Sequence, residues 1–251
     1  MNHRYAISDI HGNAKQFLEL LDYVDPDPEE LVICGDLVNR GLDAWGVYVE
    51  CQALLKEGAS IVWGNHDLAH KANYDRDPSV PDISFRHEDI GGLQTQKSIE
   101  LAQMKHGHAH VHKILNYVWD RMEFFIEDDD YIFVHAAINP RIPYMEDQKV
   151  SDLLTGHPDW KNPNIDHAFD QTIVFGHTPT VLLHRDIEEE DMTVWYSPRR
   201  RKLGIDTGAG FYKKLSMVDL EEGKVIEYNM LTGGIGDYKF RYKSPRKRTY
   251  Y

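Results

Sequence analysis

The sequence has few of the features that mark secreted or membrane proteins. Among its 251 residues are only two cysteines, Cys34 and Cys51, too few for a disulfide framework and compatible with a reducing compartment. No stretch approaches the roughly 20 consecutive apolar residues that a membrane-spanning helix needs. The first residues show no long apolar run followed by a cleavage site. We therefore expect no signal peptide, no membrane partner and a cytoplasmic location.

Positive charge is also scarce. The formal net charge is −13, which disfavours nucleic acid as a partner because a surface that binds phosphate backbones has to be positive. The exception is the segment 239–251, KFRYKSPRKRTYY, which contains six basic residues and no acidic residue. We expect this segment to be a solvated tail, with docking on an acidic partner as the alternative.

Apolar periodicity predicts strands and helices in alternation over the first quarter of the chain. Short apolar runs at 4–8, 31–34 and 60–63 are typical of buried strands. Between them, apolar residues recur with the helical period over 14–24 and 44–55. This order is typical of a parallel α/β unit with right-handed crossovers.

Each of these three strands runs directly into a polar cluster: SDIHGN at 8–13, GDLVNRG at 35–41 and GNHD at 64–67. Taken alone, the first cluster favours a turn in which Asp9 is a cap residue and His11 a surface neighbour. In open α/β sheets, however, ligands bind beyond the carboxyl ends of the strands. Three such clusters delivered to one edge therefore favour a shared site.

Two later strand-like runs extend the pattern. YIFVHAAINP leads into His135, and TIVFGHTP leads into His177. The candidate metal ligands, all at the carboxyl end of a β-like run, are Asp9, His11, Asp36, Asn65, His135 and His177. This mixed nitrogen and oxygen set suits Mn, Fe or Zn better than Ca or Cu(I). Two cations about 3.5–4 Å apart need a bridging carboxylate, and Asp36 is the natural bridge because its strand lies between the other two in sequence.

In this order the motifs resemble those of the calcineurin-like metallophosphoesterases, and within them the phosphoprotein phosphatase branch. That branch includes bacterial and phage serine/threonine phosphatases and the symmetrical dinucleoside tetraphosphatases. The motifs span residues 9–178, and IDTGAG at 205–210 resembles the C-terminal part of bacterial members. Each motif alone is weak, whereas five in order, each after a strand, are specific.

The resemblance implies a division of roles. Asp9, His11 and Asp36 would hold one divalent metal ion. Asp36, Asn65, His135 and His177 would hold a second ion. Mn is the expected metal, with Fe or Zn as alternatives. A metal-bound hydroxide would attack phosphorus, and His66 would be the general acid. Arg40 would clamp two phosphate oxygens, and Asn65 would also face the substrate.

Two of these roles have structural alternatives. Arg40 could pair with a surface carboxylate, and His66 could be a structural imidazole. Asp67 is expected to orient its neighbours rather than to bind metal.

Three departures from the family pattern bear on the substrate. Asn39 stands where protein phosphatases of the branch usually have an aspartate that orients the catalytic histidine. No arginine lies between Arg141 and Arg185, so a second phosphate clamp rests on Arg141 as a guess. The run after His177 lacks the second histidine that is typical of nuclease-like and phosphodiesterase-like members.

These observations predict a dinuclear-metal-dependent phosphoesterase that acts on phosphomonoesters, including phosphoserine or phosphothreonine in proteins. The substrate would be a phosphorylated protein or a small phosphoester. The alternative is a symmetrical hydrolase of dinucleoside polyphosphates, which Asn39 favours. A non-catalytic metal-binding regulator is a third hypothesis. It is disfavoured because His66 and Arg40 are not ligands, and a purely structural metal site needs neither.

The fold implied by the resemblance is a β-sandwich of two mixed sheets flanked by helices, whereas the pattern alone supports α/β with a parallel portion. We expect one domain over 1–238 with a helical, His-rich insertion at about 68–121, followed by the basic tail 239–251. The run HGHAHVHK at 106–113 is expected to be a solvated face, with a third metal site as the alternative.

Overall fold

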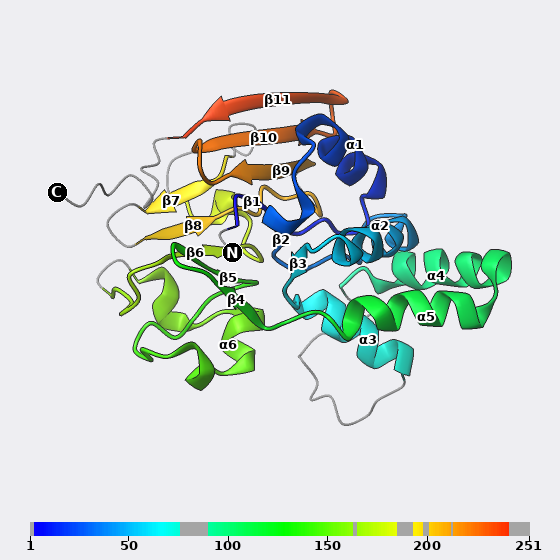
Figure 1. Ribbon diagram of the computed structural model, residues 1–251, viewed down its shortest axis with the longest axis horizontal. Helices are drawn as coiled ribbons and strands as arrows, with labels where there is room; N and C mark the ends of the chain where they lie inside the picture. The colour runs from blue at the N-terminus through cyan, green and yellow to red at the C-terminus, as the bar shows by residue number, and fades with distance from the viewer. Residues whose placement is uncertain are drawn as a thin grey trace.

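The computed structural model describes residues 3–75, 90–162, 165–184, 193–197, 201–211 and 213–240. Two mixed β-sheets form the centre of the described chain, as the resemblance implied. The six-stranded sheet has the order β11-β10-β9-β1-β2-β3, and the five-stranded sheet has the order β4-β5-β6-β8-β7. Figure 1 shows both sheets, with helices on their outer sides.

The strands of the first sheet are β1 (Tyr5–Ile7), β2 (Leu31–Ile33), β3 (Ser60–Ile61), β9 (Lys214–Asp219), β10 (Lys224–Asn229) and β11 (Gly234–Lys239). The strands of the second are β4 (Phe125–Glu127), β5 (Tyr131–Val134), β6 (Thr172–Phe175), β7 (Trp195–Ser197) and β8 (Lys202–Gly204). The α-helices are α1 (Ala14–Val24), α2 (Ala44–Lys56), α3 (Asn65–Asp75), α4 (Gly92–His106), α5 (His108–Trp119) and α6 (Val150–Thr155). Short 3-10 helices are η1 (Pro28–Glu30), η2 (Met145–Asp147), η3 (Pro158–Lys161) and η4 (Thr180–Leu182).

The parallel part of each sheet aims several strand ends in the same direction. In the first sheet β2 pairs in parallel with both β1 and β3, which confirms the predicted α/β unit. In the second sheet β6 pairs in parallel with both β5 and β8. Strands β9 and β10 pair antiparallel as a hairpin, in which Lys224 pairs with Asp219. The sequence pattern did not predict β11, whose last residue, Lys239, is the first residue of the predicted basic tail; residues 241–251 lie outside the described residues.

Alternation along the strands divides the core into layers. Ala6 and Val32 face the residues of the second sheet, among them Phe133 and Val174, and together they fill the space between the sheets. The intervening residues of the same strands, such as Ile7, face the helices on the outer side. This two-faced burial explains why the central strands are apolar throughout.

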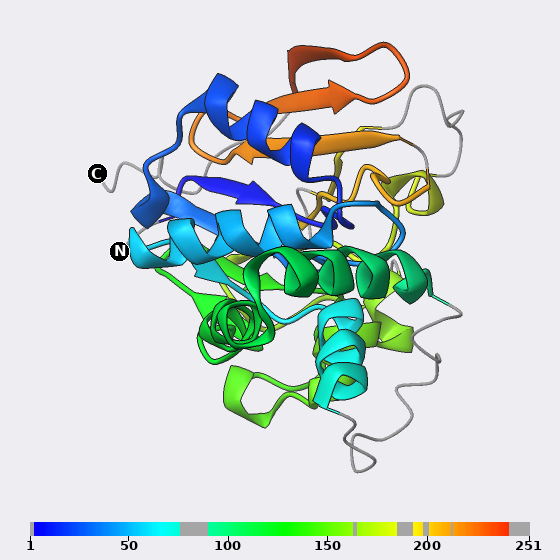
Figure 2. The same cartoon turned by 90° about the vertical axis from the view of Figure 1, so that its right-hand side faces the viewer.

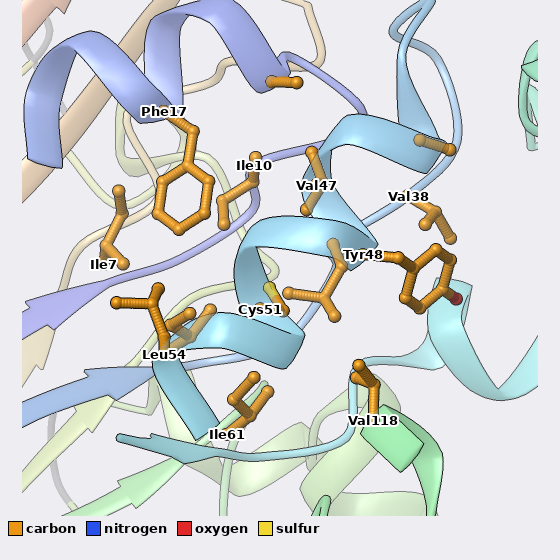
Figure 3. Packing of buried hydrophobic residues seen from close by; sticks show 14 of the residues in the cluster. Ile7, Ile10, Phe17, Val38, Val47, Tyr48, Cys51, Leu54, Ile61 and Val118 are labelled. Atoms are coloured by element: carbon orange, nitrogen blue, oxygen red, sulfur yellow. The ribbon is translucent and has the colours of Figure 1, made fainter. Parts of the chain in front are cut away.

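The helical layer covers the outer face of the first sheet. Figure 3 shows Phe17 of α1 beside Ile7 and Ile10, and Leu54 of α2 near Ile61 of β3. Helix α2 begins at its cap residue Asp43, whose carboxylate accepts a hydrogen bond of 2.8 Å from the backbone N–H of Gly46. This cap fixes the start of α2 just after the GDLVNRG cluster.

Residues 68–121, the predicted insertion, comprise most of α3 together with α4 and α5; residues 76–89 lie outside the described part. Helices α4 and α5 both contact α2, and α4 lies beside α2 in Figure 2. Their apolar residues, including Ile99, Val111 and Trp119, belong to the same core cluster as α1 and α2. The histidines at 106, 108, 110 and 112 are all exposed, as expected for a solvated face. None of the helices in the described ranges is both long enough and apolar enough to cross a bilayer.

Candidate active site

The structure brings all six candidate ligands together at the carboxyl ends of the parallel strands. Asp9 and His11 follow β1, Asp36 follows β2, Asn65 begins α3 after β3, His135 follows β5 and His177 follows β6. Strand ends from both sheets therefore meet at one edge, where Asp9 and His177 lie close together although 168 positions separate them in the sequence. At this junction the backbone N–H of His177 donates to Asp9 Oδ2 at 2.9 Å.

The backbone at these residues is held in an uncommon conformation. Asp9, His11, Asp36 and His177 have φ values of 55°, 49°, 56° and 63°. Non-glycine residues rarely adopt this left-handed region, and they persist there only where the surrounding structure holds them. Such strain concentrates at functional sites, because it aims side chains where a regular strand would not.

Two groups of side chains converge, and Asp36 belongs to both. Potential ligand atoms of His11, Asp36 and His66 lie within 4.8 Å of one another, as do those of Asp36, His135 and His177. Asp36 Oδ2 lies 3.7 Å from His11 Nε2, and Asp36 Oδ1 lies 3.4 Å from His135 Nε2. The Asp36 carboxylate therefore stands in the centre, as a bridging group would.

Asn65 and Asp9 complete the two groups. Asn65 Oδ1 lies 3.0 Å from His135 Nε2 and 3.0 Å from His177 Nδ1. Asp9 Oδ1 lies 3.7 Å from His11 Nε2, and Ser8 Oγ donates a hydrogen bond to Asp9 Oδ2. Carboxylate, amide and imidazole atoms thus face one another at short range.

Two of the imidazoles are oriented by backbone carbonyls. His11 Nδ1 donates to the carbonyl of Val38 at 2.9 Å, and His135 Nδ1 donates to the carbonyl of Cys34 at 2.9 Å. These hydrogen bonds leave the lone pair of each Nε2 directed at the centre of the cluster. This is the arrangement by which proteins orient metal-ligating histidines.

The electrostatics of the cluster suit divalent cations. Burial, followed by the charge of Asp9, raises the pKa of Asp36. Burial lowers the pKa of His11, and it lowers the pKa of His177 to about 3, so both imidazoles are neutral, the form that binds metals. Crowded carboxylates beside neutral imidazoles are stabilised by a cation placed among them. The donor set of this structure therefore fits a divalent metal site.

Asp67 orients the loops that carry the ligands. Its carboxylate accepts hydrogen bonds from the backbone N–H groups of Asp36 at 2.8 Å, Leu37 at 3.0 Å and Gly64 at 3.1 Å. Burial and the Asp36 carboxylate raise the pKa of Asp67 to about 8, although hydrogen bonds from Gly64 and Leu37 act in the opposite direction. With its oxygens engaged in this way, Asp67 links the loops after β2 and β3.

Arg40 and His66 lie side by side next to the cluster. Arg40 Nη1 lies 2.6 Å from His11 Nε2, and Arg40 Nη2 lies 3.1 Å from His66 Nε2. The amide nitrogen of Asn39 lies 3.0 Å from His66 Nδ1. Burial, then the charges of His11 and Arg40, lower the pKa of His66. In the described part of the chain, Arg40 forms no ion pair with a carboxylate, and its guanidinium faces His11 and His66.

Some residues of the site were not predicted. The buried Asp206 follows β8 at the same sheet edge, and burial and the Asp9 carboxylate raise its pKa. The ring of Phe211 lies under the Arg40 guanidinium, with its centroid 4.0 Å from Cζ. Asp206 follows the strand-like run KLGI, so the rule that placed the six ligands would have found it. Phe211 follows no strand and left no comparable signal.

Arg141, the guess for a second phosphate clamp, points to a different partner. Its Nε donates to Asp159 Oδ2 at 2.7 Å, and its side chain is exposed. Within the described ranges, Arg141 forms hydrogen bonds with Asn139 and Asp159 and none with the candidate ligands. Similarly, the exposed histidines of the run 106–113 form no metal-like group among the described residues.

Comparison with known proteins finds a phosphoesterase family and relatives named as tetraphosphatases. A sequence model of the calcineurin-like phosphoesterase family matches residues 4–193. Over 161 residues the chain is 31% identical to the symmetrical bis(5'-nucleosyl)-tetraphosphatase of Nitrosospira multiformis, covering 60% of this chain and 49% of that protein. Over 72 residues it is 42% identical to the protein of the same name from Erwinia tasmaniensis, covering 28% of this chain and 26% of that protein. The chain thus spans about half the length, or less, of these curated relatives.

Solved structures share the fold across nearly the whole chain. The crystal structure of a candidate diadenosine tetraphosphatase superposes with a TM-score of 0.56 at 20% identity, covering 95% of this chain and 94% of that one. A cold-active protein-tyrosine phosphatase from Shewanella superposes with a TM-score of 0.54 at 15% identity, covering 94% of this chain and 80% of that one. At these identities the likeness is one of fold.

Proposed function

The chain belongs to the calcineurin-like phosphoesterase family, and from this premise we propose that it hydrolyses phosphoric esters or anhydrides with two divalent metal ions. In this proposal, Asp9, His11 and Asp36 hold one ion, and Asp36, Asn65, His135 and His177 hold the other. Mn is the proposed metal, and Fe and Zn are the alternatives, because the mixed nitrogen and oxygen donors suit all three. The proposal includes a cytoplasmic location and a single catalytic unit that contains α3, α4 and α5.

The residues beside the cluster supply the remaining chemistry. Two ions, when bound, polarise phosphoryl oxygens and make a water a better nucleophile. Arg40 donates from its planar guanidinium to two phosphate oxygens, which holds phosphorus in line for displacement. Asn65, at the start of α3, also faces the substrate. His66 delivers a proton from Nε2 to the leaving oxygen, and Asn39 holds the opposite side of the ring through Nδ1.

The contact between Asn39 and His66 carries our proposal for the substrate. A neutral amide 3.0 Å from Nδ1 stabilises an imidazolium less than a carboxylate would, and burial and Arg40 further lower the pKa of His66. A protonated acid is therefore scarce at neutral pH. A serine or threonine alkoxide is a poor leaving group that needs a fully protonated imidazolium, whereas a nucleoside diphosphate is a better leaving group, to which the Nε2–H of a neutral His66 ring can still donate.

We therefore propose symmetrical cleavage of dinucleoside tetraphosphates into two nucleoside diphosphates. Two observations support this choice: the amide at Asn39, and the names of the relatives in Nitrosospira multiformis and Erwinia tasmaniensis. Phosphomonoesters, including phosphoserine and phosphothreonine in proteins, are the competing substrates of the test below.

The test is a substrate panel with the Mn-loaded protein. Chromatography follows the products formed from diadenosine tetraphosphate, and phosphate release is measured from p-nitrophenyl phosphate and from phosphoserine and phosphothreonine peptides. We expect ADP as the product and weak release from the peptides. His66→Asn should lower kcat by about 100-fold or more, whereas His108→Asn, the matched change at an exposed histidine, should not change it. Release of phosphate from the peptides without ADP formation would overturn the proposed substrate. Inactivity on every substrate of the panel would overturn the proposed function.

A further inference from the structure

The segment that carries Asn39 and Arg40 has an unusual backbone. Two consecutive non-glycine residues adopt positive φ, with values of 72° at Asn39 and 70° at Arg40. Such a conformation persists only where neighbouring groups hold it, and it turns backbone N–H groups away from any regular ladder. The partners of these N–H groups therefore decide where both side chains point.

Those partners come from α4 and the residue before it. The N–H of Asn39 donates to Thr95 Oγ1 at 2.8 Å, and the N–H of Arg40 donates to the carbonyl of Gly91 at 3.0 Å. One turn further along α4, Ser98 Oγ accepts from the N–H of Trp45 at 3.0 Å. Gly91, Thr95 and Ser98 are spaced by four and three residues, which places them on one face of the helix.

The close approach of α4 depends on residue size at this face. Gly91 has a φ of 85°, and a Cβ atom there would lie 2.9 Å from Arg40 N and 3.0 Å from Arg40 Cγ. Thr95 is fully buried, with 0% of its surface exposed. Its hydroxyl is therefore the one solvent-shielded side-chain acceptor that the Asn39 N–H meets among the described residues.

We propose that Thr95 is a positioning residue of the active site: it holds the Asn39 backbone, and through it the Asn39 amide, against His66 Nδ1. The proposal rests on the proposed function, in which His66 acts on the leaving oxygen. The chain of contacts runs from Thr95 Oγ1 to Asn39 N at 2.8 Å and from the Asn39 amide to His66 Nδ1 at 3.0 Å. Helix α4 thereby sets the orientation of His66 from outside the strand-end loops.

A merely structural role for Thr95 makes different predictions. The same helix also contributes Ile99 and Ala102 to the core, so a change on α4 can destabilise the fold in general. A structural role would lower the melting temperature and the active fraction without altering kcat per folded, metal-loaded molecule. A positioning role lowers kcat in molecules that are folded and loaded.

The experiment compares Thr95→Val, which keeps the shape but removes the acceptor, with Thr95→Ser, which keeps the acceptor. Ser98→Ala is the matched control, because it removes a hydroxyl from the same face that does not touch Asn39. With diadenosine tetraphosphate and full Mn loading, Thr95→Val should lower kcat by about 10-fold to 100-fold with a smaller change in KM. Thr95→Ser and Ser98→Ala should stay within about 2-fold of the parent. In a His66→Asn background, Thr95→Val should lower kcat little further.

A second readout does not depend on catalysis. In metal-free protein with ¹⁵N-labelled histidine, the Nδ1 resonance of His66 reports its hydrogen bond, and it should shift in Thr95→Val but not in Ser98→Ala. A shift in an inactive protein would uphold the positioning and overturn only the proposed function. The proposal would be overturned if Thr95→Val left both the Nδ1 resonance and kcat unchanged. It would also be overturned if Thr95→Val and Ser98→Ala lowered kcat equally. If Thr95→Val does not fold, Thr95→Ala against Thr95→Ser makes the same comparison.

Discussion

The contact between Phe211 and Arg40 allows a prediction whose size can be worked from the structure. The Arg40 guanidinium carbon lies 4.0 Å from the centroid of the Phe211 ring, and Phe211 is 60% exposed. At an exposed site a cation–π contact contributes about 0.5–1 kcal/mol. Because about 1.4 kcal/mol corresponds to a tenfold change in an equilibrium constant, losing the ring should weaken phosphate binding by about 2-fold to 5-fold.

The perturbation is Phe211→Leu, which keeps an apolar side chain but removes the ring face. We expect KM for diadenosine tetraphosphate, and the inhibition constant of inorganic phosphate, to rise by about 2-fold to 5-fold with kcat changed less. Phe211→Tyr keeps the ring face and should leave both constants at the values of the parent protein. Tyr23→Leu changes a similarly exposed aromatic residue, 54% exposed on α1, and should have no effect.

A double-mutant cycle decides whether the effect passes through Arg40. If Phe211 acts by holding the guanidinium, Phe211→Leu should have no further effect on KM once Arg40 is replaced by alanine. An equal loss in both backgrounds would refute the reasoning, because it would mean that Phe211 acts on the substrate or the fold by another route. An unchanged KM in the single variant would refute it as well.

Three further predictions concern groups held by short hydrogen bonds. Asp67→Asn should lower the free energy of unfolding of the metal-free protein by about 1–3 kcal/mol, because an amide replaces one of the two oxygens that accept three backbone N–H groups. Urea unfolding measures this change, and a loss under about 0.5 kcal/mol would contradict the prediction. Burial would raise the pKa of Asp128, but hydrogen bonds from His3 and neighbouring N–H groups outweigh it, so the folded pKa is lowered. The stability that this lowered pKa provides is present above the unfolded pKa and is lost as the pH falls through the folded pKa. In Asp128→Asn the free energy of unfolding should therefore fall less steeply toward acid pH, and a pH curve parallel to that of the parent protein would contradict this. In Asn39→Asp a carboxylate should raise the pKa of His66 and move the high-pH limb of the kcat profile upward, whereas an unmoved limb would exclude this coupling.

The candidate ligands could be predicted because each is tied to a local pattern. Asp9, Asp36 and His135 directly follow short apolar runs, and the rule that parallel strands end at one edge brings them together without knowledge of the full topology. The pattern alone did not give the two-sheet arrangement, which came from the family resemblance. It also missed β11, because GIGDYK has two glycines and little apolar alternation.

The groups that surround the ligands could not be predicted in the same way. Thr95 meets Asn39 across 56 positions, and its neighbours in QTQKS read only as one face of a polar helix. Phe211 meets Arg40 because the loop before β9 folds over the site, which depends on how β9 pairs with β1. Such contacts depend on the packing of distant segments, and local periodicity carries no record of them.

The metal stoichiometry of the purified chain tests the central claim most directly. Protein equilibrated with Mn and freed of excess ions should contain two ions per chain by elemental analysis. Asp9→Asn should remove one ion and leave the other, whereas Asp36→Asn should weaken both because its carboxylate faces both groups. Two ions retained in Asp36→Asn, or no ion bound by the unaltered chain, would contradict a dinuclear centre built on these six side chains.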